Sequence, residues 1–196
     1  PAPAPSPAPS PSPAPSPSPA PAPTPAPAPT TTPVAITVID GVLQNALVCL
    51  DANGNGACDT GETQGRTNAS GQVTLAVPNA DVGKYTVLAV VGTDAVDADS
   101  GPVAQAYTLV APPDSTAVVS PWTTLVEQAR QLGVTTAQAA AAVASQATGV
   151  SPLADYSADR SGNAGSALAS RAGRILVASM QKQLAAVLPL AGQADA

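Results

Sequence analysis

Short apolar runs between residues 34 and 114 predict a series of β-strands. Turn-forming stretches separate these runs, such as NASG at residues 68–71 and PPD at residues 112–114. No helical period interrupts the series, and consecutive strands of this kind favour an antiparallel β-sandwich. We expect strands at residues 35–38, 46–50, 72–77, 84–91 and 105–110.

After the last predicted strand, the apolar period becomes three to four residues, which predicts helices. Ser120 followed by Pro121 is a helix start signal, because serine caps a helix and proline suits its first position. Gly133 is the matching stop signal. Thr135, with a glutamine three residues later, fits the capping box of a second, alanine-rich helix that ends at Gly149.

A third and longer helix is predicted for residues 164–188, with Pro189 ending it. Its expected apolar face consists of Leu168, Ala172, Ile175, Met180, Leu184 and Val187. Alanine and glycine elsewhere on the helices bury little apolar area, at about 25 cal/mol per Å². The helices therefore form either a modest layer within the molecule or a contact with another subunit.

Proline occupies every odd position from Pro1 to Pro29, separated by Ala, Ser or Thr. This pattern favours a polyproline II helix, which would reach roughly 90 Å at about 3.1 Å per residue. Residues 1–33 are interpreted as a stalk, or alternatively as a segment that packs in an assembly. Residues 34–114 then form the sandwich, and residues 115–196 an alanine-rich helical region.

The net charge is −6, and no cluster of Lys or Arg could follow a phosphate backbone, so we expect no nucleic-acid partner. Residues 40–114 carry nine carboxylates against Arg66 and Lys84, which favours a cation as ligand. No apolar run reaches the eighteen or so residues of a membrane span. Because the chain begins without a methionine, we expect an exported protein that has lost a leader, with a lipid anchor upstream as one arrangement.

Residues 51–62 match the twelve-residue calcium loop, in which oxygen ligands occupy positions 1, 3, 5, 7, 9 and 12. The expected ligands are Asp51, Asn53, Asn55, the backbone carbonyl of Ala57, Asp59 and Glu62, with Gly56 at the sharp turn. The alternative is a solvated turn held by Asn and Asp hydrogen bonds. Because a strand, and not a helix, precedes the loop, we expect the ion to brace a β-domain.

Cys49 and Cys58 bracket most of this loop. The chain contains no histidine, and two sulfurs alone are too few for a structural zinc site. The spacing also differs from the C-x-x-C of thiol oxidoreductases. A disulfide between Cys49 and Cys58 is therefore favoured, and the alternative is two buried free thiols.

Three further carboxylates, Asp94, Asp97 and Asp99, are candidate ligands of the same ion or of a second one. The alternative is a solvated acidic loop. Catalysis has little support, because the absence of histidine excludes Ser-His-Asp and Cys-His arrangements. The sequence also lacks a phosphate-binding glycine loop and a dinucleotide fingerprint, so we expect no enzyme.

The sequence DTGE at residues 59–62, followed by TNASG at residues 67–71, resembles the calcium-bearing B-type modules of bacterial surface adhesins and related prealbumin-like domains. Residues 119–126, VSPWTTLV, are similar to the segment that follows such domains in some proteobacterial secreted or lipid-anchored proteins, with Trp122 in place of a leucine. The resemblance implies a prealbumin-like or immunoglobulin-like sandwich, an extracellular location and a non-enzymatic role.

These observations together favour an extracellular bacterial structural protein that is stabilised by calcium and a disulfide. We expect it to form a homo-oligomer or a surface filament through its proline tract and its alanine-rich helices. The alternative hypothesis is a monomeric module of a surface lipoprotein that binds a glycan or another protein.

Overall fold

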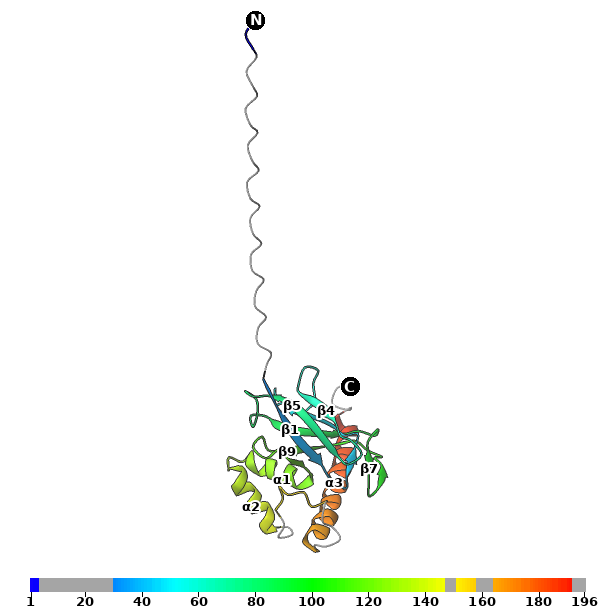
Figure 1. The fold of residues 1–196 in the computed structure, drawn as a ribbon. Coiled ribbons are helices and arrows are strands. Elements are labelled where there is room, and N and C mark those ends of the chain that lie inside the picture. The colour runs from blue at the N-terminus through cyan, green and yellow to red at the C-terminus, as the bar shows by residue number, and fades with distance from the viewer. Residues whose placement is uncertain (4–29, 147–150, 158–163, 192–196) are drawn as a thin grey trace.

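The computed structural model describes residues 1–3, 30–146, 151–157 and 164–191 (Figure 1). Most of the expected polyproline tract falls in residues 4–29 and lies outside the described residues. A β-rich region comes first in the chain and three helices follow it. The strands are β1 Thr31–Val38, β2 Leu43–Gln44, β3 Leu47–Asp51, β4 Gln64–Arg66, β5 Gln72–Pro78, β6 Thr86–Val91, β7 Val96–Asp97, β8 Gly101–Pro102, β9 Tyr107–Ala111 and β10 Val118–Val119.

The strands form three sheets, with the orders β10-β1-β5, β4-β3-β6-β9 and β2-β7-β8. All pairs are antiparallel except β1 and β10, which are parallel, with Thr37 opposite Val118 and Val38 opposite Val119. The expectation of a purely antiparallel fold was therefore wrong at this pair. Parallel strands need a long connection, and here the chain passes through all the other strands between β1 and β10.

The main core lies where the two larger sheets contribute alternate side chains to one cluster, as expected for strands with one buried face. From the sheet of β1 and β5 come Ile36, Val38, Leu75 and Val77, and from the sheet of β3, β6 and β9 come Val48, Leu50, Val87, Ala89, Val91 and Leu109. Each large aliphatic side chain buried in this way contributes about 1.5–3 kcal/mol to folding. The arrangement is compatible with a sandwich of sheets.

All five predicted strands are present, and the largest difference in position is at the first. The β1 strand begins at Thr31 and includes Pro33, whereas the sequence predicted a start at residue 35. Pairing with β5, which places Pro33 opposite Ala76, extends the strand into the end of the proline-rich sequence. The short strands β2, β4, β7, β8 and β10 were not predicted.

The first two helices, α1 Pro121–Arg130 and α2 Thr136–Gln146, begin where the sequence predicted. The Ser120 side chain accepts a hydrogen bond from the Thr123 backbone N–H, and the Thr123 hydroxyl accepts one from the Ser120 N–H. This reciprocal pair confirms the predicted cap of α1. Gly133, with φ of 95°, follows the end of α1. The predicted end of α2 at Gly149 lies outside the described residues.

The third helix, α3 Ala164–Ala191, extends two residues beyond Pro189, where the sequence placed its end. Its predicted apolar face is buried only in part: Ala172 packs against a core cluster, but Leu168 is 51% exposed and Ile175 is 70% exposed. The helix also packs through Ala169 and Val177, which are 2% and 5% exposed. The side chains of Met180, Leu184 and Val187 lie outside the described ones.

Small residues explain this rotation of α3. A side chain at Gly173 would begin 3.2 Å from the Tyr156 hydroxyl and 3.6 Å from Trp122 Nε1. The Trp122 indole N–H donates to the Ala169 carbonyl at 3.1 Å. Close approach of the α3 backbone to α1 therefore turns the larger Leu and Ile side chains of α3 outward.

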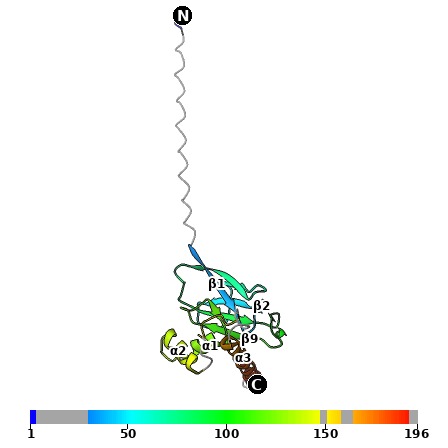
Figure 2. The same cartoon turned by 60° about the horizontal axis from the view of Figure 1, so that its bottom comes forward.

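The three helices lie together on one side of the strands in both views (Figures 1 and 2). Val177 of α3 joins the core cluster of the sheets, and β10, which follows residue 114, pairs with β1. The helical and β regions thus share a core. No helix in the described part of the chain is long and apolar enough to cross a membrane.

Candidate functional site

The predicted calcium loop connects β3 to β4, and its first residue, Asp51, is buried at the end of β3. Asp51 Oδ1 accepts the backbone N–H of Asn55 at 3.1 Å, and Asp51 Oδ2 accepts that of Gly56 at 2.9 Å. Gly56 has φ of 77°, which glycine adopts without steric cost. The backbone therefore turns around a carboxylate that the sheet holds in place.

The other predicted ligands join the same network of hydrogen bonds. Asp59 Oδ2 accepts the side-chain amide groups of Asn53 at 2.7 Å and of Asn55 at 2.6 Å. Glu62 Oε1 accepts the Ala52 N–H at 2.8 Å, and Glu62 Oε2 accepts the Asp59 N–H at 3.1 Å. All five side chains at the ligand positions of the template therefore belong to one short loop and are linked to one another directly or through its backbone.

The donor set of the loop fits calcium in its chemistry, and its side chains are now engaged in hydrogen bonds with one another. Carboxylate, amide and carbonyl oxygens are the ligands that calcium takes, six to eight at a time. Within the described residues, however, no group of three or more Asp, Glu, Cys or His side chains is placed to hold a metal. Binding would require the amides of Asn53 and Asn55 to turn their oxygens inward and release Asp59.

The predicted disulfide is present between Cys49 and Cys58, with their Cα atoms 5.6 Å apart. Cys49 is fully buried in β3, and Cys58 lies inside the loop. The alternative of two free thiols was therefore wrong. The bond ties the second half of the loop to a central strand of the four-stranded sheet.

The structure does not bring the three further candidate ligands to one point. Asp94 forms an ion pair with Arg66 at 3.0 Å and accepts a hydrogen bond from the Asn45 amide at 3.1 Å. Asp99 forms an ion pair with Arg174 of α3 at 2.7 Å. Neither carboxylate shares these partners with the loop of residues 51–62.

Asp97 is buried and serves a local turn. Its Oδ1 accepts the backbone N–H of Asp99 at 2.8 Å, and its Oδ2 accepts the Ser100 hydroxyl at 2.9 Å. The segment is bent and not extended, yet both carboxylates lie beside Gly41, where an added Cβ would collide with Asp97 Oδ1 and lie 3.1 Å from Asp99 Cγ. The reason for the bend is the ordinary preference of aspartate to bond the backbone two residues on.

Sequence reasoning missed Asp40, which is 5% exposed and lies just after β1. Burial, and next the negative charge of Asp97, raise the pKa of Asp40 from 3.8 to about 7. Burial and the nearby Asp40 likewise raise the pKa of Tyr107. The sequence offers no clear signal for Asp40, because the reason for the glycine after it, a side chain at Gly41 colliding with Asp97 Oδ1, exists only in the folded chain.

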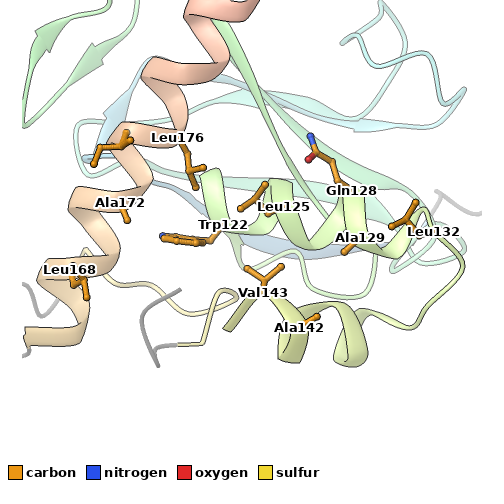
Figure 3. A pocket seen from close by; sticks show the side chains of 11 residues that line it. Trp122, Leu125, Gln128, Ala129, Leu132, Ala142, Val143, Leu168, Ala172 and Leu176 are labelled. Atoms are coloured by element: carbon orange, nitrogen blue, oxygen red, sulfur yellow. The ribbon is translucent and has the colours of Figure 1, made fainter. Parts of the chain in front are cut away.

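A groove of about 900 Å³ runs between the three helices (Figure 3). Trp122 and Leu125 of α1, Val143 of α2 and Leu176 of α3 point toward one another across it. Leu168 lies at one end of the groove, on the α3 side. The exposed apolar residues of α3 that the sequence assigned to a packed face, Leu168 and Ile175, therefore line this groove.

The resemblance of residues 48–75 to adhesin modules stays a prediction. It is carried by the loop and by the turn after it, in which Asn68 Oδ1 accepts the N–H groups of Ser70 at 2.8 Å and Gln72 at 3.0 Å. Comparison of the chain with protein-family models, with curated proteins and with solved structures finds no match.

Proposed function

We propose that the protein is a non-enzymatic, extracellular structural protein in which a calcium ion at residues 51–62 and the Cys49–Cys58 disulfide brace the β-region. The observation that carries the proposal is the hydrogen-bond network of the loop, which contains all five side chains at the ligand positions of the template. A disulfide inside the same loop supports a stabilising role, since both devices restrain one connection between two strands.

Calcium would act by replacing hydrogen bonds between neutral and charged groups with direct attraction to a divalent cation. Asp51 belongs to β3, and Glu62 lies two residues before β4. An ion held by both would therefore fix the separation of these paired strands. At a free calcium concentration ten times the Kd, binding to the folded state adds about 1.4 kcal/mol to the free energy of unfolding.

Thermal unfolding in calcium and in EDTA tests this proposal. We expect calcium to raise the Tm of the natural protein, and we expect Glu62→Ala to abolish that increase. Asp81→Ala removes one carboxylate outside the loop and should keep the full increase. Equal Tm values in calcium and EDTA for the natural protein would reject the calcium site.

Assembly is the second part of the proposal, and exposed apolar side chains support it. Leu132, Ile175 and Leu168 are 85%, 70% and 51% exposed, and all three line the groove between the helices. Sedimentation at rising protein concentration in calcium, with negative-stain images of the same samples, should show oligomers or filaments. A monomer at every concentration would contradict this part.

A monomeric binding module is the second candidate, and the groove itself favours it. A concave apolar site of this size suits apolar side chains of a protein partner better than a glycan, because sugars need polar contacts and flat aromatic surfaces. Leu168→Glu separates the two functions. If the protein assembles through the groove, Leu168→Glu should lower the molecular mass of the particles in solution. If the protein is a monomeric module, the molecular mass should not change. Val82→Glu, at another exposed position, is the control and should not change the mass in either case.

A further inference from the structure

A second cavity, of about 450 Å³, lies between α3 and the loop that precedes β9. The cavity is separate from the apolar groove and has both charged and apolar walls, which include Asp40, Tyr107, Arg174 and Val177. Two hydrogen bonds fix the position of the helix beside it. Gln181 Nε2 donates to the Gln105 carbonyl at 2.8 Å, and Gln105 Nε2 donates to the Gln181 carbonyl at 3.1 Å.

Asp40 carries a buried oxygen that lacks a partner. Its Oδ2 lies 3.5 Å from the Tyr107 hydroxyl, which donates to it at the limit of a hydrogen bond. Its Oδ1 is buried and has no hydrogen-bond partner among the described residues. Buried polar atoms are almost always paired in folded proteins, because leaving one unpaired costs about 1–3 kcal/mol. Asp40 also lines the cavity, and a turn of its carboxylate would present this unpaired acceptor to a ligand.

The charges around Asp40 determine the sign of that ligand. Asp97 also lines the cavity, and both of its oxygens are engaged by the turn at residues 97–100. The Arg174 guanidinium, the positive group on this wall, directs Nη1 to Asp99 at 2.7 Å and not to Asp40. Burial and Asp97 raise the pKa of Asp40 to about 7, and the Arg174 charge, which lowers it, offsets them only in part. A further positive charge beside Asp40 would therefore be stabilised.

A metal ion fits this wall poorly. Calcium needs six to eight oxygen ligands. No three carboxylates in the described part of the chain are placed to hold a metal ion, and the oxygens of Asp97 already accept hydrogen bonds from the turn. An ammonium group needs only three acceptors, and its alkyl chain tolerates apolar walls. Val103 and Val177 provide such walls beside Asp40.

We propose that this cavity binds the ammonium end of an alkylamine, with the Asp40 carboxylate turned toward it as the acceptor and Val103 and Val177 against the alkyl chain. A volume of about 450 Å³ is within the range of small-molecule sites. Two sources share this chemistry: a free alkylamine, and the lysine side chain of a partner protein. The calcium loop takes no part, so the site is tested in EDTA.

Titration with n-butylammonium, followed by protein NMR chemical shifts near neutral pH, tests the free-amine source. A short peptide with one central lysine tests the other source, with the norleucine peptide as its uncharged control. We expect saturable shifts at Val103, Tyr107 and Val177 with at least one of the cationic probes. We expect no saturable shifts with n-butanol or with the norleucine peptide.

Asp40→Asn keeps the shape of the side chain and should weaken binding about tenfold or more, since it removes the charged acceptor. Asp94→Asn, which removes a carboxylate outside the cavity, should bind as the natural protein does. Ala178→Phe narrows the cavity from α3 without changing any charge, and it should also weaken binding. Equal affinity in Asp40→Asn and natural protein, or no saturable shift with either cationic probe, would overturn the proposal.

Discussion

The buried Asp40 predicts an unusual dependence of stability on pH. In the folded protein, burial and the charge of Asp97 raise the pKa of Asp40 from 3.8 to about 7. In the unfolded chain, the carboxyl returns to the ordinary value near 3.9. Asp40→Asn is the informative substitution, because the amide resembles the protonated acid in shape and does not titrate.

The sign and size of the effect follow from the two pKa values. Between pH 4 and 7 the folded state holds a proton that the unfolded state has released, so stability falls as pH rises. The stabilising contribution is complete below the unfolded pKa and is lost as pH rises through the folded one. The slope is about 1.4 kcal/mol per pH unit, which gives about 2 kcal/mol between pH 5 and 7.

Urea unfolding of the natural protein and Asp40→Asn, at pH values from about 5 to 8, measures this contribution. The same neighbours, Asp97, Asp99 and Arg174, surround position 40 in both proteins, so the comparison isolates the change at that position. We expect the variant to gain about 2 kcal/mol relative to the natural protein between pH 5 and 7. Asp94→Asn, at an exposed ion pair, serves as the control and should show no such trend.

A difference between Asp40→Asn and the natural protein that stays constant with pH would refute this reasoning. It would mean that Asp40 titrates normally in the folded state, and therefore that its carboxyl is solvated. A difference that changes in the opposite direction would mean that a positive partner lowers its pKa. Direct measurement of the Asp40 carboxyl carbon by NMR would separate these two outcomes.

Three further predictions concern stability. Replacement of Cys49 and Cys58 by alanine should lower the free energy of unfolding by about 2.6 kcal/mol, the loop-entropy value for a separation of nine residues, and unchanged urea midpoints would contradict it. Arg130→Ala should lower the free energy of unfolding by about 1–3 kcal/mol, because Glu127 is 2% exposed and loses two hydrogen bonds at 2.7 and 2.8 Å. In calorimetry, Arg130→Ala should lower the Tm more than Arg130→Lys does. Gly71→Ala should cost about 2 kcal/mol or more, because φ is 70° and the new Cβ would lie 2.8 Å from a backbone carbonyl of β1, and a Tm equal to that of the natural protein would show that the turn adjusts freely.

Strands with one buried face were predictable from sequence because every second residue is buried and therefore apolar. Leu75 and Val77 of β5 alternate with exposed positions, and the observed strand exceeds the predicted one by a single residue. The two-residue strands are too short to show this alternation. In β10, Val118 and Val119 are strand residues only because β1 lies beside them, and β1 is some eighty residues distant in the chain.

The orientation of α3 could not be predicted, because two faces of the helix are plausible by composition. The face with the larger side chains, Leu168 and Ile175, has the stronger periodicity and was chosen. The observed contact uses Ala169 and Gly173, whose small size permits close approach to α1. A helix can pack through its large side chains, which bury more apolar area, or through its small ones, which allow its backbone to come closer. The shape of the surface opposite decides between them, and the sequence of the helix alone does not reveal that shape.

The candidate sites differ in how far they could be predicted. The loop at residues 51–62 and the Cys49–Cys58 bond are contained in one continuous stretch, so spacing alone identified them. The cavity at Asp40 combines residues from the turn after β1, from β9 and from α3 that are far apart in the sequence. An isolated aspartate before a glycine is typical of a turn, and its burial follows only from the folded arrangement.

The β1 strand also has a mechanical consequence. A pull applied at Thr30 along the axis of β1 would load this strand first. Seven register pairs join β1 to β5 between Thr31 and Thr37, and two more join it to β10. When the opposite end of the domain is held, these backbone hydrogen bonds are sheared together and do not open one by one. The domain is therefore built to resist pulling at its N-terminal end.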